Sequence, residues 1–97
     1  MEHAIIGVVA TSRAGRDKGR RFAVTGIADE SSVYIADGDT RRLNKPKRKK
    51  LKHLSLSNAR IALDEALKKG DKAAADAYLR KALAALDTNR FDSNEEG

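Results

Sequence analysis

Residues 8–24, VVATSRAGRDKGRRFAV, constrain the fold of this chain more than any other stretch. Two apolar runs containing β-branched residues flank a turn that holds Gly15, Asp17 and Gly19. Glycine adopts positive φ at little steric cost, so the backbone can reverse tightly here, and we expect a β-hairpin. The turn also carries five basic residues: Arg13, Arg16, Lys18, Arg20 and Arg21. Such a cationic tip fits an anion-binding surface and equally a charged edge that keeps a hairpin soluble.

The neighbouring segments predict further short strands. Residues 3–11 are apolar on both alternating faces, which predicts a strand with both faces buried. Residues 33–36 predict a strand, the Asp-Gly-Asp sequence at 37–39 a hairpin turn, and residues 40–43 a returning fourth strand. Residues 51–54 predict a short closing strand. Five short strands in about 55 residues favour a small barrel, which leaves few exposed edges.

Beyond residue 56 the apolar period changes to that of helices. Apolar residues recur three and four positions apart, and Gly70 and Asp71 supply a helix end and a helix start. We therefore expect an αα-hairpin over residues 57–87, followed by a disordered acidic tail over residues 88–97. The hairpin is expected to pack on the barrel, to pair with a second copy or to dock a protein, which leaves the oligomeric state open.

The positive charge of the chain lies in its first half. Residues 1–56 hold 13 Lys and Arg against 6 acidic residues, whereas residues 57–97 hold 7 against 8. Residues 41–52, RRLNKPKRKKLK, are the densest segment, with eight basic residues in twelve. A basic surface favours polyanion binding, and a solvated charge run is the competing interpretation. The predicted RNA-phosphate contacts are Arg13, Arg16, Lys18, Arg20, Arg21, Arg41, Arg42, Lys45, Lys47, Arg48, Lys49, Lys50 and Lys52, with Gly15 and Gly19 shaping the turn.

Several classes of site are not predicted. The absence of cysteine excludes disulfides, thiolate chemistry and Cys-rich zinc sites, and it fits a reducing cytosol. His3 and His53 are fifty positions apart without a nearby carboxylate set, so we expect no metal, no cofactor and no enzyme activity. No apolar run approaches the roughly 20 residues of a membrane span, and the first residues lack a signal-peptide pattern. We expect a cytoplasmic protein without a membrane partner.

Short pieces of the first half follow one another in a characteristic order and spacing over roughly residues 4–56. They are Gly7-Val8-Val9, Ala14-Gly15-Arg16-Asp17-Lys18-Gly19, Phe22-Ala23-Val24, Ile35-Ala36-Asp37-Gly38, and Pro46-Lys47-Arg48-Lys49-Lys50 leading to Lys52-His53-Leu54. In these pieces the chain resembles the KOW-motif proteins, in particular the fourteen-e type of large-subunit ribosomal protein and the bacterial KOW-domain RNA-binding proteins similar to it. The resemblance implies an SH3-like β-barrel, RNA binding and association with ribosomes or translation.

Together these observations predict an α+β protein with a small SH3-like KOW barrel over residues 1–56 and a C-terminal αα-hairpin. The expected function is non-catalytic binding of structured RNA, with ribosomal RNA the leading candidate. Aromatic residues are scarce, which favours phosphate and shape recognition over base-by-base contacts. Tyr34 is the one residue suited to base stacking, although packing is the favoured interpretation of it. Two alternatives stay open: a protein-interaction adaptor acting through the helical hairpin, and a non-specific basic DNA-binding protein.

Overall fold

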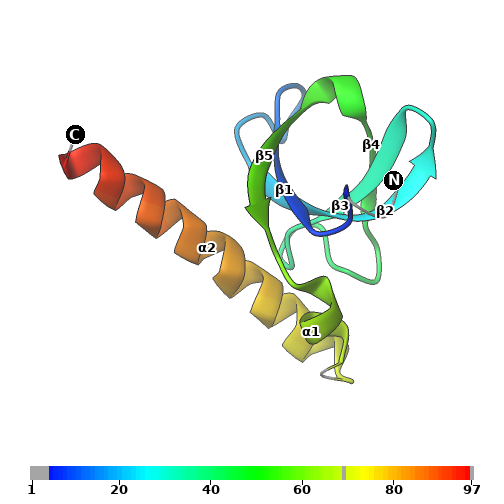
Figure 1. The fold of residues 1–97 in the computed structure, drawn as a ribbon. Coiled ribbons are helices and arrows are strands. Elements are labelled where there is room, and N and C mark those ends of the chain that lie inside the picture. Colours follow the sequence, from blue (N-terminus) through cyan, green and yellow to red (C-terminus); the bar gives the residue numbers. More distant parts are fainter. Residues whose placement is uncertain (1–4, 69, 97) are drawn as a thin grey trace.

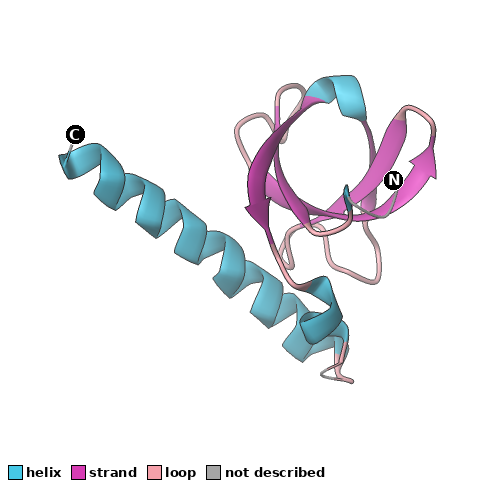
Figure 2. Ribbon diagram, in the orientation of Figure 1, coloured by secondary structure: helices cyan, strands magenta, loops and turns pink. Residues whose placement is uncertain are grey.

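The computed structural model describes residues 5–68 and 70–96, with side chains through residue 86. A five-stranded antiparallel sheet is followed by two helices, as Figure 1 and Figure 2 show, and this confirms the predicted α+β class. In chain order the elements are β1 (Val8–Ser12), β2 (Arg21–Asp29), β3 (Ser32–Ala36), β4 (Lys47–Lys50), the 3-10 turn η2 (Leu51–His53), β5 (Leu54–Arg60), α1 (Leu63–Leu67) and α2 (Lys72–Glu96).

The sheet is open but strongly curled. Its strand order is β4-β3-β2-β1-β5, and every neighbouring pair is antiparallel. The turn η2 connects the edge strand β4 to the other edge strand β5 (Figure 1). Within the described ranges no ladder joins these two edges, so hydrogen bonding does not close the sheet. The curl surrounds an interior cluster of buried residues: Ala10, Phe22, Val24, Val33, Ile35 and Leu54.

The outer face of β1 and β2 is buried too, because α2 packs against it. Val9 and Ala23, which are partners in the β1–β2 register, join Leu79 and Leu83 of α2 in a second buried cluster. Val9 and its neighbour Ala10 therefore face opposite clusters. The predicted burial of both faces of the first strand is confirmed, although β1 begins at Val8 and residues 5–7 of the predicted strand form a turn. The physical cause of this burial is the curled sheet on one side and a helix on the other.

Two polar contacts attach α2 to the loop between β3 and β4. The buried Asp76 carboxylate accepts a hydrogen bond from the backbone N–H of Leu43 at 2.8 Å. The Arg80 guanidinium donates to the carbonyl oxygen of Gly38, also at 2.8 Å. A carboxylate is costly to bury unless it is hydrogen-bonded, so Asp76 favours one position of the loop on the helix. Of the three arrangements expected for the helices, packing on the sheet is the one observed.

Residues 40–43 do not form the returning strand that the sequence predicts. This stretch belongs to a loop, and β4 begins only at Lys47. The carboxylate of Asp37 accepts hydrogen bonds from the backbone N–H groups of Asp39 and Arg41, both at 2.9 Å. These donors are then unavailable to a strand ladder. Residues 47–50 of the basic run form the edge strand β4, so this part of the run is ordered and not merely a solvated charge run.

The boundary between sheet and helices lies later in the chain than expected. β5 extends to Arg60 because its backbone pairs with β1. Ser57, where we expected the helical hairpin to begin, instead donates its hydroxyl to the carbonyl oxygen of Val9 at 2.8 Å. The first helix is therefore short, with five residues in α1. Residues 51–53 form η2 in place of the predicted strand.

The second helix is longer than expected. α2 has 25 residues and continues to Glu96, although the sequence predicts a disordered tail after residue 87. No proline or glycine interrupts residues 88–96, so nothing in the backbone chemistry forces the helix to stop. His3 and Gly97 lie outside the described residues. None of the helices in the described ranges has the length and apolar character that a membrane crossing requires.

Candidate nucleic-acid interface

The turn between β1 and β2 has the conformation that its glycines predict. Gly15 and Gly19 have φ values of +78° and +88°. The N–H of Gly19 donates to the carbonyl oxygen of Ser12 at 2.8 Å, and the N–H of Ser12 donates to that of Arg20 at 2.9 Å. These bonds close the hairpin. The closed turn exposes four basic residues: Arg13, Arg16, Lys18 and Arg20.

Asp17 in this turn is buried and joins the two basic segments of the sequence. The Lys47 ammonium group donates to the Asp17 carboxylate at 3.0 Å, and the Arg41 guanidinium lies 3.9 Å from the same oxygen. Beside them the Lys49 ammonium group donates to the carbonyl oxygen of Ala14 at 3.2 Å. Two segments that are thirty residues apart in sequence therefore lie side by side.

The cations around Asp17 change its titration. The hydrogen bond from Lys47 holds the pKa of the Asp17 carboxyl below its ordinary value of 3.8, and the charges of Lys47, Arg41 and Lys49 act in the same direction. Burial raises the pKa by disfavouring the charged form, but the cations outweigh it. A pKa that is lower in the folded state means that ionised Asp17 stabilises the fold above the unfolded-state pKa. That stabilisation is lost as the pH falls through the folded-state pKa.

This contact predicts a specific acid sensitivity. We expect the free energy of unfolding to decrease between about pH 5 and about pH 2, in part because Asp17 becomes protonated. An Asp17→Asn variant should be less stable than the unmodified chain at about pH 6, and the difference should shrink at about pH 2. Urea unfolding followed by circular dichroism at both pH values measures this. The exposed Glu30→Gln variant is the control, and a difference for Asp17→Asn that does not change with pH would contradict the role of Lys47.

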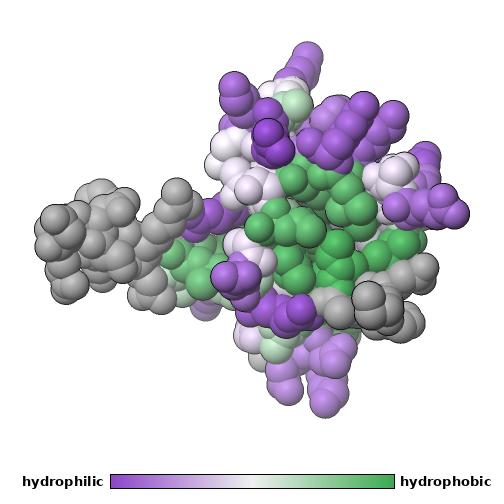
Figure 3. All heavy atoms as spheres, turned by 45° about the horizontal axis from the view of Figure 1, so that its top comes forward, coloured by the Kyte–Doolittle hydropathy of each residue, from purple (hydrophilic) through white to green (hydrophobic). Residues whose placement is uncertain are grey.

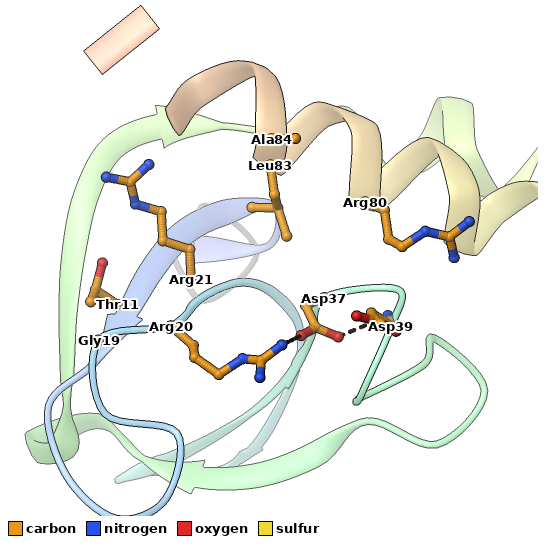
Figure 4. A pocket seen from close by; sticks show the side chains of 9 residues that line it. All are labelled: Thr11, Gly19, Arg20, Arg21, Asp37, Asp39, Arg80, Leu83 and Ala84. Atoms are coloured by element: carbon orange, nitrogen blue, oxygen red, sulfur yellow. Dashed lines mark hydrogen bonds and ion pairs between the residues drawn. The ribbon is translucent and has the colours of Figure 1, made fainter. Parts of the chain in front are cut away.

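A second aspartate, Asp37, binds a cation of the β1–β2 hairpin. The Arg20 guanidinium donates to the Asp37 carboxylate at 3.4 Å, and Figure 4 shows the two side chains pointing toward each other. They line an open groove of about 720 Å³ between the hairpin, the β3–β4 loop and α2, which Arg21 and Arg80 also line (Figure 4). Asp39 is a further lining residue. Three arginines face two aspartates here, so the charges in this groove nearly balance.

The basic side chains of β4 alternate between the two faces of the sheet. Lys47 and Lys49 stand opposite buried residues of β3 and reach the β1–β2 turn. Arg48 and Lys50 stand on the outer face and are exposed. Arg48 also forms an ion pair with Asp29 of β2, which spans the intervening strand β3. Three of the four cations in this strand thus contact protein groups, Lys47 and Lys49 at the turn and Arg48 on the outer face, and Lys50 is exposed without a side-chain partner among the described residues.

The unpaired cations of the predicted set lie at the rim of the sheet. In Figure 3, hydrophilic side chains surround an apolar centre on the face in view. Within the described ranges, seven predicted contact residues are exposed and make no side-chain hydrogen bond or ion pair: Arg13, Arg16, Lys18, Arg42, Lys45, Lys50 and Lys52. The structure therefore separates these exposed, unpaired cations from five that are held by protein groups: Arg20, Arg41, Lys47, Arg48 and Lys49. The remaining predicted residue, Arg21, is half-buried and lines the groove beside α2.

The sequence did not single out Arg80 and Asp76, which secure the helix. The sequence does contain a signal for them. Ala75, Leu79 and Leu83 form the buried stripe of the helix, and Asp76 and Arg80 each follow a residue of that stripe, so they lie at its border with the sheet. His53 is half-buried, and its carbonyl oxygen accepts a hydrogen bond from the backbone N–H of Arg13 at 2.8 Å.

The described residues contain no cluster of three or more His, Cys, Asp or Glu that could hold a metal ion. No protein-family model matches the chain, and a comparison with curated proteins gives no significant match. The molecule is thus defined by its fold and charge as a small α+β domain with a basic rim.

Proposed function

We propose that this chain is a non-catalytic RNA-binding protein that holds structured RNA through its phosphates, in association with ribosomes or translation. The observation that carries the proposal is the contact between the two basic segments, the β1–β2 turn and β4. Lys47 of β4 binds the Asp17 carboxylate of the turn, and Lys49 binds the carbonyl oxygen of Ala14. A single charged turn is an ordinary surface feature, whereas two adjacent basic segments on one rigid surface can contact several phosphates of one backbone.

The fold supports the same proposal. We propose that the curled sheet is an SH3-like barrel of the KOW type, which the resemblance of residues 4–56 implies. In favour of this, five short antiparallel strands surround one interior cluster, and a 3-10 turn connects the two edge strands. The β1–β2 turn, which holds the central glycines of the resemblance, carries three residues of the basic rim: Arg13, Arg16 and Lys18.

The separation of unpaired from protein-bound cations indicates which residues are free to contact RNA phosphates. Lys47 and Lys49 already bind protein groups, so their loss would weaken the fold as well as any ligand contact. Arg16, Lys18 and Lys50 are exposed and unpaired within the described part of the chain. We assign the phosphate contacts first to these exposed residues, of which Arg16 and Lys18 lie in the β1–β2 turn and Lys50 lies in β4.

A charge-removal series tests the proposal. The variant R16Q/K18Q/K50Q should bind a defined RNA stem-loop more weakly than the unmodified chain, because it lacks cations that displace condensed counterions. The slope of log affinity against log salt should decrease by roughly one for each phosphate contact removed. Filter binding or fluorescence anisotropy with labelled RNA at several salt concentrations measures both quantities.

The matched control is K68Q/K72Q/K81Q, which removes three exposed cations from the helical half. It should leave the RNA affinity and the salt slope nearly unchanged, and both variants should keep the thermal stability of the unmodified chain. Equal losses in the two variants would mean that net charge alone drives binding. Unchanged binding in R16Q/K18Q/K50Q would contradict the assigned interface.

The structure gives less support to the adaptor alternative. The apolar stripe of α2, including Leu79 and Leu83, packs on the sheet, so it is not free to serve as an adaptor surface. A non-specific DNA-binding protein remains an outcome of the same assay. A duplex DNA of matched length that competes as well as the RNA stem-loop would favour that alternative.

A further inference from the structure

The outer face of the sheet is only partly covered by α2. Ala36 of β3 lies in the cluster beneath the helix. Tyr34 is two residues earlier on the same strand, so its side chain leaves the same face of the sheet. It lies outside the covered area and is 37% exposed. The outer face therefore has a covered part over β1, β2 and the Ala36 end of β3, and an uncovered part over the rest of β3 and β4, where Tyr34 is the aromatic residue.

The neighbours of Tyr34 leave its ring accessible. Its partner on β2 is Gly26, which has no side chain. A Cβ atom placed on Gly26 would lie 3.6 Å from Cδ2 of the Tyr34 ring, so the ring lies close to the bare backbone of β2. One ring face can contact the strand while the other meets the solvent. This geometry favours stacking of a planar group on the tyrosine.

Positive charge adjoins the ring. Arg48 is the partner of Tyr34 on β4, and Lys50 stands two residues further along the same outer face. Both are exposed, and Arg48 is also paired with Asp29, the acidic residue at the end of β2. The combination of an exposed aromatic ring with adjoining cations is that of single-stranded nucleic-acid sites, in which a base stacks while its phosphate meets a cation.

We propose that Tyr34 is a stacking platform for one unpaired base of the bound RNA, with Arg48 and Lys50 contacting its flanking phosphates. This inference rests on the proposed RNA binding and deepens it. A ring that projects from a strand cannot stack on the face of a base that remains paired and stacked inside a helix. The preferred ligand is then a structured RNA with an unpaired nucleotide, such as a stem with a bulge.

The test uses two blunt-ended RNA duplexes, each made of two strands without a loop, that differ only by one bulged adenosine. A Tyr34→Trp variant contains the single tryptophan of the chain, because the natural sequence has none. Its fluorescence should be quenched by the bulged RNA and much less by the uninterrupted one. The unmodified chain should prefer the bulged RNA by roughly tenfold, the range that one base–aromatic stack supplies. A Tyr34→Phe variant should keep this preference.

Two variants separate stacking from packing. Tyr34→Leu still covers Gly26 with apolar atoms but has no π face, so it should bind both RNAs with the affinity that the unmodified chain shows for the uninterrupted RNA. Leu56→Ala removes a side chain that is 48% exposed on β5, and it should keep the preference for the bulge. Urea unfolding verifies that each variant is folded.

The possible outcomes are distinguishable. Tight binding of both RNAs with equal affinity, no differential quenching in Tyr34→Trp and no effect of Tyr34→Leu would overturn the platform while leaving RNA binding intact. Failure of the unmodified chain to bind either RNA would instead overturn the proposed function. A bulge preference that persists in Tyr34→Leu would place the unpaired base elsewhere on the protein.

Discussion

A Gly38→Ala variant is expected to lose about 2–5 kcal/mol of unfolding free energy, the combined cost of left-handed strain and overpacking. Gly38 has a φ of +81°, which is unfavourable for residues with a Cβ atom. The added Cβ would also overlap the carbonyl oxygen of Asp76 and lie 3.1 Å from its carbonyl carbon. Both are backbone atoms of α2, so the overlap can be relieved only by moving the helix away from the loop.

Gly19→Ala is the matched control. Its φ of +88° imposes a similar left-handed strain, but no heavy atom lies within 4 Å of the Cβ that would be added. It should lose only about 1–2 kcal/mol, the strain alone. Urea unfolding of both variants by circular dichroism gives the comparison. Equal losses would show that the close approach of α2 to Gly38 does not contribute.

A Leu79→Ala variant is expected to lose about 2–5 kcal/mol of unfolding free energy. The Leu79 side chain is fully buried between α2 and the sheet, in the cluster that contains Val9, Ala23 and Leu63. The truncation removes apolar contacts and leaves a cavity that the curled sheet can fill only partly. Alanine is a good helix former, so the loss would reflect packing and not helix propensity.

Leu67→Ala supplies the control for this prediction. The Leu67 side chain is 63% exposed on α1, so its truncation should change the unfolding free energy by no more than about 0.5 kcal/mol. Chemical denaturation of the two variants measures the difference. A small effect of Leu79→Ala would mean that the packing of this side chain contributes little to the attachment of α2 to the sheet.

Both predictions concern contacts between the helix and the sheet, and these also bear on function. The helix covers Ala36 but not Tyr34, so its position determines how much of the outer face is open to a ligand. The contacts of Asp76 and Arg80 with the β3–β4 loop hold it there. The helical half thus determines how much of the proposed RNA surface is exposed, although none of the assigned phosphate contacts lies in it.

Local signals predicted the elements in which a few neighbouring residues decide the conformation. The hairpin of β1 and β2 follows from alternating apolar residues around Gly15 and Gly19, and the burial of both strand faces follows from Val9 and Ala10. Local signals failed at residues 40–43, because the carboxylate of Asp37 binds the backbone donors that a strand would use. They failed at Ser57 for a related reason, since pairing with β1 extended β5 over the expected helix start.

The amino-acid sequence by itself determined that the chain has a basic, strand-forming first half and a helical second half, because charge, apolar period and glycine conformation act over only a few residues. Tertiary structure alone decided how the basic residues are used. Every residue in β4 is basic, so no apolar residue marks which side chains face inward. Pairing with β3 turned Lys47 toward Asp17, thirty residues away, and left Arg48 on the outer face beside Tyr34. Such a division depends on contacts between distant segments, which no local pattern contains.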